Sequence, residues 1–337
     1  MHSRLEVGAL IRALFFATIA TACIAAPPDN LSPPDRITVQ AARQQLTVWS
    51  RSPKQARAAL VMVHGRTWSA RPAFDFESHS KDLSLLRKLA AAGFATYAVD
   101  LPGYGASARD PTGWLSPTRA AEDVEAVLRN VAQRHANLPP PVLLGWSRGS
   151  KISALVATRA NEPISALILY AYNMDPNAPP LYGPAAGEAP AVRNTLESAR
   201  SDFVSPKVSS PELIQDFVNA ALSADPTQAA VCCDIEFRAI RAESIRVPTL
   251  LIHGARDPAF KAAVASAFFS QLAAVERRWV IVGDGDHAAH LEETAPEVTA
   301  AIVDFIRAAL TPYGGDRATG QGKPSTTASF PAVTQAP

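Results

Sequence analysis

Leu143-Leu144-Gly145-Trp146-Ser147-Arg148-Gly149 places a serine between two glycines, directly after an apolar run. The residues from Pro141 to Leu144 predict a buried strand, and a helix is expected to begin near Arg148. The pattern Gly145-x-Ser147-x-Gly149 fits the sharp strand-to-helix turn that presents a serine hydroxyl at a helix N-terminus. Small neighbours let such a turn close, and the free amides of the helix favour a developing negative charge. We therefore interpret Ser147 as a nucleophile and not as part of an ordinary turn.

Apolar runs and helical patterns alternate on both sides of this turn. Ala58 to Val63 is continuously apolar, as expected for a strand buried on both faces of a parallel sheet. Further strands are predicted at Phe94–Val99, Ile164–Tyr170, Thr249–His253 and Trp279–Val282, and edge strands at Ile37–Gln40 and Gln45–Trp49. Helices are predicted at Asp82–Ala92, Thr118–His135, Arg148–Arg159, Pro258–Ala274 and Thr294–Leu310. The alternation predicts an α/β fold with a mostly parallel central sheet flanked by helices.

The segment from Asn173 to Ser244 interrupts this alternation. After a proline-rich start it has helical patterns, which we place at Ala191–Phe203, Pro211–Leu222 and Gln228–Ile240. About seventy residues lie where the core needs only one helix. We predict a helical cap at 173–245, inserted between the two parts of the core at 27–172 and 246–312. The tail at 313–337 is rich in Gly, Pro, Ser and Thr and is predicted to be disordered.

The first 26 residues have the pattern of a secretory signal peptide. Arg4 and Arg12 precede and border an uncharged apolar run, Ala13 to Ile24, which is followed by the small pair Ala25-Ala26. Cleavage there predicts an exported protein, periplasmic or secreted, without a membrane span after cleavage. Lipid attachment at Cys23 is one alternative, and an apolar first helix is another.

Composition excludes some classes of function. The net charge is +1, charged residues make up 19% of the chain and no basic patch stands out, so we expect no nucleic-acid partner. A hydrophobic fraction of 47% is ample for a core. After signal cleavage only the adjacent pair Cys232 and Cys233 would remain. That count excludes a disulfide framework and leaves either two thiols or one strained vicinal disulfide. The composition does not indicate an oligomeric state.

A serine hydroxyl needs a base to act as a nucleophile, and the base needs a third group to fix its tautomer. Asp257 follows the predicted strand Thr249–His253, and His287 follows the strand that ends at Val282. Both therefore belong at carboxyl ends of strands, where open α/β sheets carry their sites. Ser147, Asp257 and His287 are our predicted catalytic residues.

Rival candidates for these roles lie nearby in the sequence. Asp175 follows the strand that ends near Tyr170, and His290 lies three residues beyond His287. His287-x-x-His290 also has metal-ligand spacing, but no third ligand cluster is visible, so we expect no metal. We interpret Asp284 and Asp286 as solvated loop carboxylates.

The oxyanion of an acyl-transfer reaction needs donors already in place. We expect the backbone N–H of Arg148, next after the nucleophile, and that of Arg66, in the loop after His64-Gly65. His64 is interpreted as a residue that braces this loop. Trp68 and Trp146 are candidates both for the pocket lining and for the core.

Taken together, these motifs resemble the α/β-hydrolase superfamily. The resemblance covers roughly Ala58 to Leu310 and rests on His64-Gly65, Asp100-x-Pro-Gly-Tyr-Gly-x-Ser107, the Ser147 turn, Asp257 and His287, in that order. It implies the fold, a Ser-Asp-His triad, an oxyanion hole and no cofactor. It does not imply a substrate, because the fold supports many activities. Arg66-Thr67 departs from the superfamily pattern, in which glycine or a bulky apolar residue is common after His-Gly.

The sequence therefore favours an exported serine hydrolase that cleaves a carboxylic ester or related small acyl substrate. A hydrolase of amide or peptide bonds with the same triad is the alternative among enzymes. A catalytically inactive hydrolase fold that serves as a binding protein is the alternative from another class.

Overall fold

The computed structural model describes residues 33–203 and 209–311. The predicted signal peptide, 1–26, and the predicted tail, 313–337, lie outside these residues, as does the alternative lipid-attachment site Cys23. In the described part of the chain no helix has the length and apolar character needed to cross a membrane.

Within the described residues, eight strands form one sheet in the order β1-β2-β4-β3-β6-β7-β9-β10. Their bounds are Asp35–Gln40 (β1), Gln45–Arg51 (β2), Ala58–Val63 (β3), Phe94–Val99 (β4), Val142–Trp146 (β6), Ala166–Tyr170 (β7), Thr249–Gly254 (β9) and Arg277–Val282 (β10). β2 pairs antiparallel with β1 and with β4, and every pair from β4 to β10 is parallel. The predicted mostly parallel sheet is confirmed, but β2 lies inside the sheet and is not an edge strand.

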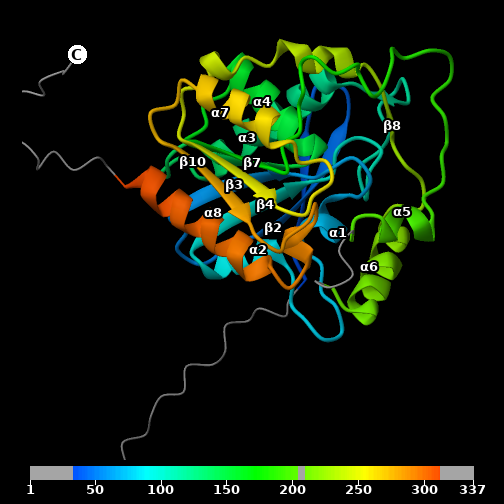
Figure 1. The fold of residues 1–337 in the computed structure, drawn as a ribbon, viewed down its shortest axis with the longest axis horizontal. Helices are drawn as coiled ribbons and strands as arrows, with labels where there is room; N and C mark the ends of the chain where they lie inside the picture. The colour runs from blue at the N-terminus through cyan, green and yellow to red at the C-terminus, as the bar shows by residue number, and fades with distance from the viewer. Residues whose placement is uncertain (1–32, 204–208, 312–337) are drawn as a thin grey trace, which may run out of the picture. The chain divides into compact units, whose positions relative to one another are not determined.

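Helices cover both faces of the sheet. Figure 1 shows α3 (Pro117–Arg134), α4 (Arg148–Arg159) and α7 (Ala262–Gln271) on one face, and α2 (Leu85–Ala91) and α8 (Ala295–Leu310) on the other. Alternate residues of β3 enter two separate apolar cores: Leu60 and Met62 join the core with α2 and α8, and Val61 joins the core with α3 and α4. The unbroken apolar run of β3 follows from this burial on both faces.

Side-chain caps set where two of these helices begin. The Ser84 hydroxyl accepts a hydrogen bond from the backbone N–H of Arg87, and Ser116 does the same for Arg119. Such caps satisfy backbone donors that have no partner in the helix. The helix predicted from Asp82 therefore begins at Leu85, after its cap. Short α1 (Ala70–Phe74) and the two-residue strand β5 (Trp114–Leu115) were not predicted.

The inserted segment is only partly helical. It holds α5 (Leu196–Arg200), α6 (Pro211–Ala224), strand β8 (Ala230–Val231) and the 3₁₀ helices η1 (Asp234–Ala239) and η2 (Ala242–Ser244). The helix predicted over 228–240 is wrong, because β8 pairs with β5 and Cys233 then adopts a left-handed φ of 63° that breaks the segment. Cys232 and Cys233 are free thiols.

Helix α6 docks on the core through aromatic side chains. The Phe217 ring is fully buried and meets the rings of Trp68, Phe76 and Phe203 edge to face, at centroid distances of 6.1, 5.5 and 5.1 Å. Edge-to-face contacts of this kind add to the stabilisation from burial. The described residues from Pro34 onward accordingly form a single compact unit, to which the described part of the insert belongs.

β6 and α4 meet in a sharp turn at Ser147, whose backbone has φ 56° and ψ −119°. The turn lies directly against the end of β3. A Cβ added at Gly149 would lie 2.2 Å from the carbonyl oxygen of Val63 and 2.4 Å from that of His64. Only glycine therefore allows the helix to approach this strand so closely.

We predict that Gly149→Ala destabilises the protein by at least about 1–3 kcal/mol, since the backbone of β3 must move to admit the methyl group. Thermal and urea unfolding would measure the loss. Gly183→Ala is the matched control, because a Cβ at Gly183 meets no atom within 4 Å. Equal melting temperatures for the two variants would contradict the close contact.

Candidate active site

Ser147, His287 and Asp257 form a chain of hydrogen bonds at the carboxyl ends of three strands. The Ser147 hydroxyl donates to Nε2 of His287 at 2.8 Å, and Nδ1–H of His287 donates to Oδ2 of Asp257 at 2.8 Å. Ser147 follows β6, Asp257 follows β9 and His287 follows β10. The structure thus brings together the three residues that the sequence predicted.

Each partner fixes the protonation state of the next. An ionised carboxylate only accepts hydrogen bonds, so Nδ1 of His287 carries the proton and Nε2 of the neutral ring is left to accept from Ser147. The other oxygen of Asp257 accepts from the backbone N–H of Ala259 at 2.8 Å, which holds the carboxylate in place. The Asp257 side chain is 1% exposed and that of His287 is 18% exposed, so the pair is largely removed from water.

Burial lowers the pKa of His287, but the hydrogen bond and the charge of Asp257 outweigh it. Asp202 and Asp286 add smaller contributions in the same direction, so the pKa lies above the ordinary value of 6.5. The ring is a better proton acceptor as a result, and it is charged below that pKa.

The rival residues lie elsewhere. Asp175 faces Lys261, with 4.0 Å between the carboxylate and the ammonium nitrogen. Asp284 is exposed and pairs with Arg256 at 2.6 Å. Asp286 was expected to be solvated as well, but it is 1% exposed, and one of its oxygens accepts from the backbone N–H of Ala288 at 2.9 Å.

His290 belongs to the core beneath the site. Its Nε2 lies 2.8 Å from the carbonyl oxygen of Ala73 and its Nδ1 lies 3.2 Å from the Tyr170 hydroxyl. Burial lowers its pKa to about 3. His287 and His290 therefore have different hydrogen-bond partners, although both contact the Trp146 ring, whose centroid is 5.8 Å from the His287 imidazole and 4.7 Å from that of His290.

Arg148 directly follows Ser147 in the chain, and Arg66 lines the same cavity as Ser147. Within residues 33–203 and 209–311, the backbone N–H groups of Arg66 and Arg148 make no hydrogen bond. The Arg66 carbonyl accepts from the Tyr104 hydroxyl. His64 braces the same loop: its Nε2 accepts from the N–H of Leu101 at 3.1 Å, and its Nδ1 lies 2.8 Å from the Gly65 carbonyl oxygen. Burial lowers the pKa of His64 to about 4, so the ring stays neutral in this role.

A cavity of about 260 Å³ opens beside Ser147. Trp68 and Trp146 are among the residues that line it, and both side chains are buried. The Trp146 indole N–H donates to the carbonyl oxygen of His287 at 2.9 Å, and that of Trp68 donates to Asp202 at 2.5 Å.

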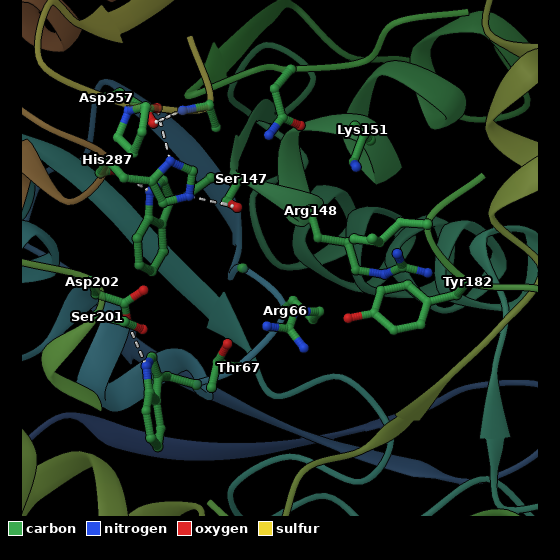
Figure 2. A pocket seen from close by; sticks show the side chains of 17 residues that line it. Arg66, Thr67, Ser147, Arg148, Lys151, Tyr182, Ser201, Asp202, Asp257 and His287 are labelled. Carbon is green, nitrogen blue, oxygen red and sulfur yellow. Dashed lines mark hydrogen bonds and ion pairs between the residues drawn. The ribbon is translucent and has the colours of Figure 1, made fainter. Parts of the chain in front are cut away.

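Sequence reasoning missed several residues of the cavity wall, among them Lys151, Tyr182 and Asp202, which Figure 2 shows around Ser147. Lys151 lies four residues after Ser147 on α4, and helical spacing alone could have placed it near the nucleophile. Tyr182 and Asp202 come from the insert, where no sequence signal indicated them.

Comparison with known families agrees with this geometry. The model of the family described as serine aminopeptidase, S33, matches residues 54–294. The chain belongs to this family. As a member of this α/β-hydrolase family it is a hydrolase, and the resemblance found in the sequence is confirmed. Among curated proteins, none matches the sequence.

Solved structures share the fold of this S33-family chain at low sequence identity. An esterase from Thermogutta terrifontis is 18% identical, with a TM-score of 0.58 over 82% of this chain and 100% of that chain. The thioesterase domain from the curacin biosynthetic pathway is 16% identical, with a TM-score of 0.56 over 82% of this chain and 100% of the domain. An esterase from Exiguobacterium antarcticum is 20% identical, with a TM-score of 0.55 over 80% of this chain and 98% of that chain.

We predict that NMR titration will find the pKa of His287 above 6.5, whereas His290 and His64 stay neutral over roughly pH 5 to 8. Asp257→Asn should lower the pKa of His287, because it removes both the charge and the hydrogen bond that raise it. Asp284→Asn is the control of equal size and should leave that pKa in place. A larger shift in the control would contradict the pairing of His287 with Asp257.

Proposed function

We propose that this hydrolase cleaves carboxylic esters through Ser147, His287 and Asp257. The observation that carries the proposal is the continuous chain of two 2.8 Å hydrogen bonds from the Ser147 hydroxyl through His287 to Asp257, beside an open cavity. A serine whose proton already points at a histidine, with that histidine oriented by a carboxylate, meets the requirements for nucleophilic attack on an acyl carbon.

In the first half of the reaction, Ser147 Oγ attacks the carbonyl carbon while Nε2 of His287 takes its proton. The negative charge that develops on the carbonyl oxygen is stabilised by the backbone N–H groups of Arg148 and Arg66. His287 then gives the proton to the leaving oxygen, the ester bond breaks, and the acyl group remains on Ser147. Asp257 stabilises the charged imidazole in between and does not take its proton.

In the second half, water takes the place of the leaving alcohol. His287 accepts a proton from the water as its oxygen attacks the acyl-enzyme, and returns it to Ser147 Oγ when that bond breaks. The products are a carboxylic acid and a free enzyme. These steps require neutral His287, and we expect activity to fall as the pH drops through its raised pKa.

Amide or peptide cleavage is the second candidate, and the description of the matched family as serine aminopeptidase favours it. Both substrate classes use the same steps, but an amine leaves less readily than an alcohol of similar size. Rates on p-nitrophenyl esters of graded chain length, set beside rates on amino-acid p-nitroanilides, separate the two. The inactive-binding alternative is disfavoured by the intact hydrogen-bond chain.

Ser147→Ala should lower turnover by about 10⁴-fold to 10⁶-fold while the protein stays folded. Labelling by a serine-reactive fluorophosphonate should disappear with it. Asp257→Asn should also lose most activity, whereas Asp175→Asn should lose little, because Asp175 faces Lys261 and not His287. Full turnover by the alanine variant, or the reverse order of the two Asp variants, would overturn the assignment.

We also propose that the protein is exported. The charged start, the apolar run and the small residues of 1–26 support this. Mass spectrometry of the mature protein should find an N-terminus near Ala26 or Pro27. An intact Met1, or a lipid on Cys23, would contradict simple signal cleavage.

A further inference from the structure

The wall of the cavity beside Ser147 carries three cationic side chains. Figure 2 shows Arg66, Arg148 and Lys151, with Tyr182 among them, on the side of Ser147 away from His287. The guanidinium groups of Arg66 and Arg148 lie 5.8 and 5.6 Å from the centroid of the Tyr182 ring, so one aromatic ring holds both groups. A cluster of like charges in so small a space is costly unless something offsets it.

Carboxylates within the described residues offset only part of this charge. Nη1 of Arg148 pairs with Asp234 at 2.6 Å, and both side chains are more than nine-tenths buried. Nη2 of Arg148 is buried without a hydrogen-bond partner. Neither Arg66 nor Lys151 forms an ion pair within residues 33–203 and 209–311.

Lys151 is held without an anion of its own. Its ammonium nitrogen lies 5.2 Å from the centroid of the Phe237 ring. Burial, together with the charge of Arg148, lowers the pKa of Lys151 to about 8, so most molecules still carry its charge at neutral pH. The cavity therefore keeps two half-buried cations available to a ligand.

The other side of the cavity has the opposite charge. Asp202 accepts the Trp68 indole N–H and is close enough to His287 to raise its pKa. Burial raises the pKa of Asp202 to about 6, so the carboxylate is mostly ionised at neutral pH. An anion in the substrate would be repelled next to His287 and attracted on the side of Arg66 and Lys151.

This asymmetry orients a substrate. His287 must protonate the leaving group, which therefore lies on the His287 side of the scissile bond, and the acyl chain extends away from it. We propose that the preferred substrates are esters of short acyl groups that carry a second, free carboxylate, bound by Arg66, Arg148 and Lys151. The cavity of about 260 Å³ lies below the range usual for drug-sized ligands, which favours a short acyl group. This inference rests on the proposed ester hydrolysis.

The test compares two esters of nearly equal shape. p-Nitrophenyl hydrogen glutarate ends in a carboxylate, and p-nitrophenyl 5-methylhexanoate ends in two methyl groups instead. We expect kcat/KM to be at least about tenfold higher for the glutarate, and this preference to shrink as salt screens the charges. Rates with Ser147→Ala protein are subtracted, because the free carboxylate of the glutarate ester also accelerates its own hydrolysis.

Lys151→Gln should reduce the ratio of the two kcat/KM values by about tenfold, and Lys151→Arg should restore part of it. Arg66→Gln should act in the same direction. Arg278→Gln is the control, since Arg278 pairs with Glu276 near the amino end of β10, at the opposite end of the sheet, and should leave the ratio unchanged. If Lys151→Gln slows both esters equally, the cations act on the oxyanion alone and the inference is overturned.

A third ester moves the carboxylate to the leaving group, in 3-carboxy-4-nitrophenyl 5-methylhexanoate. Its kcat/KM should be lower than that of p-nitrophenyl 5-methylhexanoate, which has no carboxylate. Asp202→Asn should reduce the difference between these two kcat/KM values. If the ester with the carboxylate on its leaving group has the higher kcat/KM, the proposed orientation of the substrate, with its leaving group on the His287 side, is wrong.

Glutarate binding to the Ser147→Ala protein, measured by calorimetry, does not depend on turnover. We expect binding that weakens about tenfold in the Ser147→Ala, Lys151→Gln double variant. If the unaltered protein hydrolyses none of these esters and is not labelled by the fluorophosphonate, the proposed function is overturned. Turnover of the neutral ester, with no glutarate preference and no glutarate binding, would overturn only the inference about charge.

Discussion

The contact between the Ser147 turn and the end of β3 is the constraint on which the site depends. Because Gly149 has no side chain, α4 begins against the carbonyl groups of Val63 and His64. The loop that follows β3 is thereby brought beside the start of α4, so that Arg66 and Arg148 line the same cavity as Ser147. The absence of a side chain at a single position thus allows α4 to start close to the end of β3.

Parallel pairing supplies the other half of the site. β6, β7, β9 and β10 are neighbours in the sheet and run in the same direction. Residues that follow these strands therefore lie along one edge of the sheet, although Ser147 is more than a hundred positions from Asp257 and His287 in the sequence. Trp146 then ties the two ends together, since its indole N–H donates to the carbonyl oxygen of His287. The sheet therefore holds the backbone of Ser147 and that of His287 at a fixed separation.

The same physics explains what the sequence could predict. Ala58–Val63, Phe94–Val99 and Arg148–Arg159 were predicted with their observed bounds. A strand buried on both faces is a continuous apolar run, and an amphipathic helix has apolar residues at helical spacing, so both leave a local signal in the sequence. Ser147, Asp257 and His287 could be predicted because each follows the carboxyl end of a predicted strand. The secondary structure of the insert could not be predicted in the same way, because β8 forms only by pairing with β5, which lies more than a hundred residues earlier in the chain. Tyr182 and Asp202 reach the cavity through such non-local packing, which no local pattern encodes.

The residues around the cavity come from two parts of the chain, the ends of the core strands and the insert, and these parts are subject to different structural constraints. Ser147, Asp257 and His287 come from the ends of core strands, whereas Leu181, Tyr182, Ser201 and Asp202 reach the cavity from the insert. Changes in the insert can alter the shape and charge of the wall without moving the strand ends. Proteins that descend from one ancestral gene could therefore differ in the ligands that they recognise while they keep residues equivalent to Ser147, Asp257 and His287. Such differences would accumulate first in the insert.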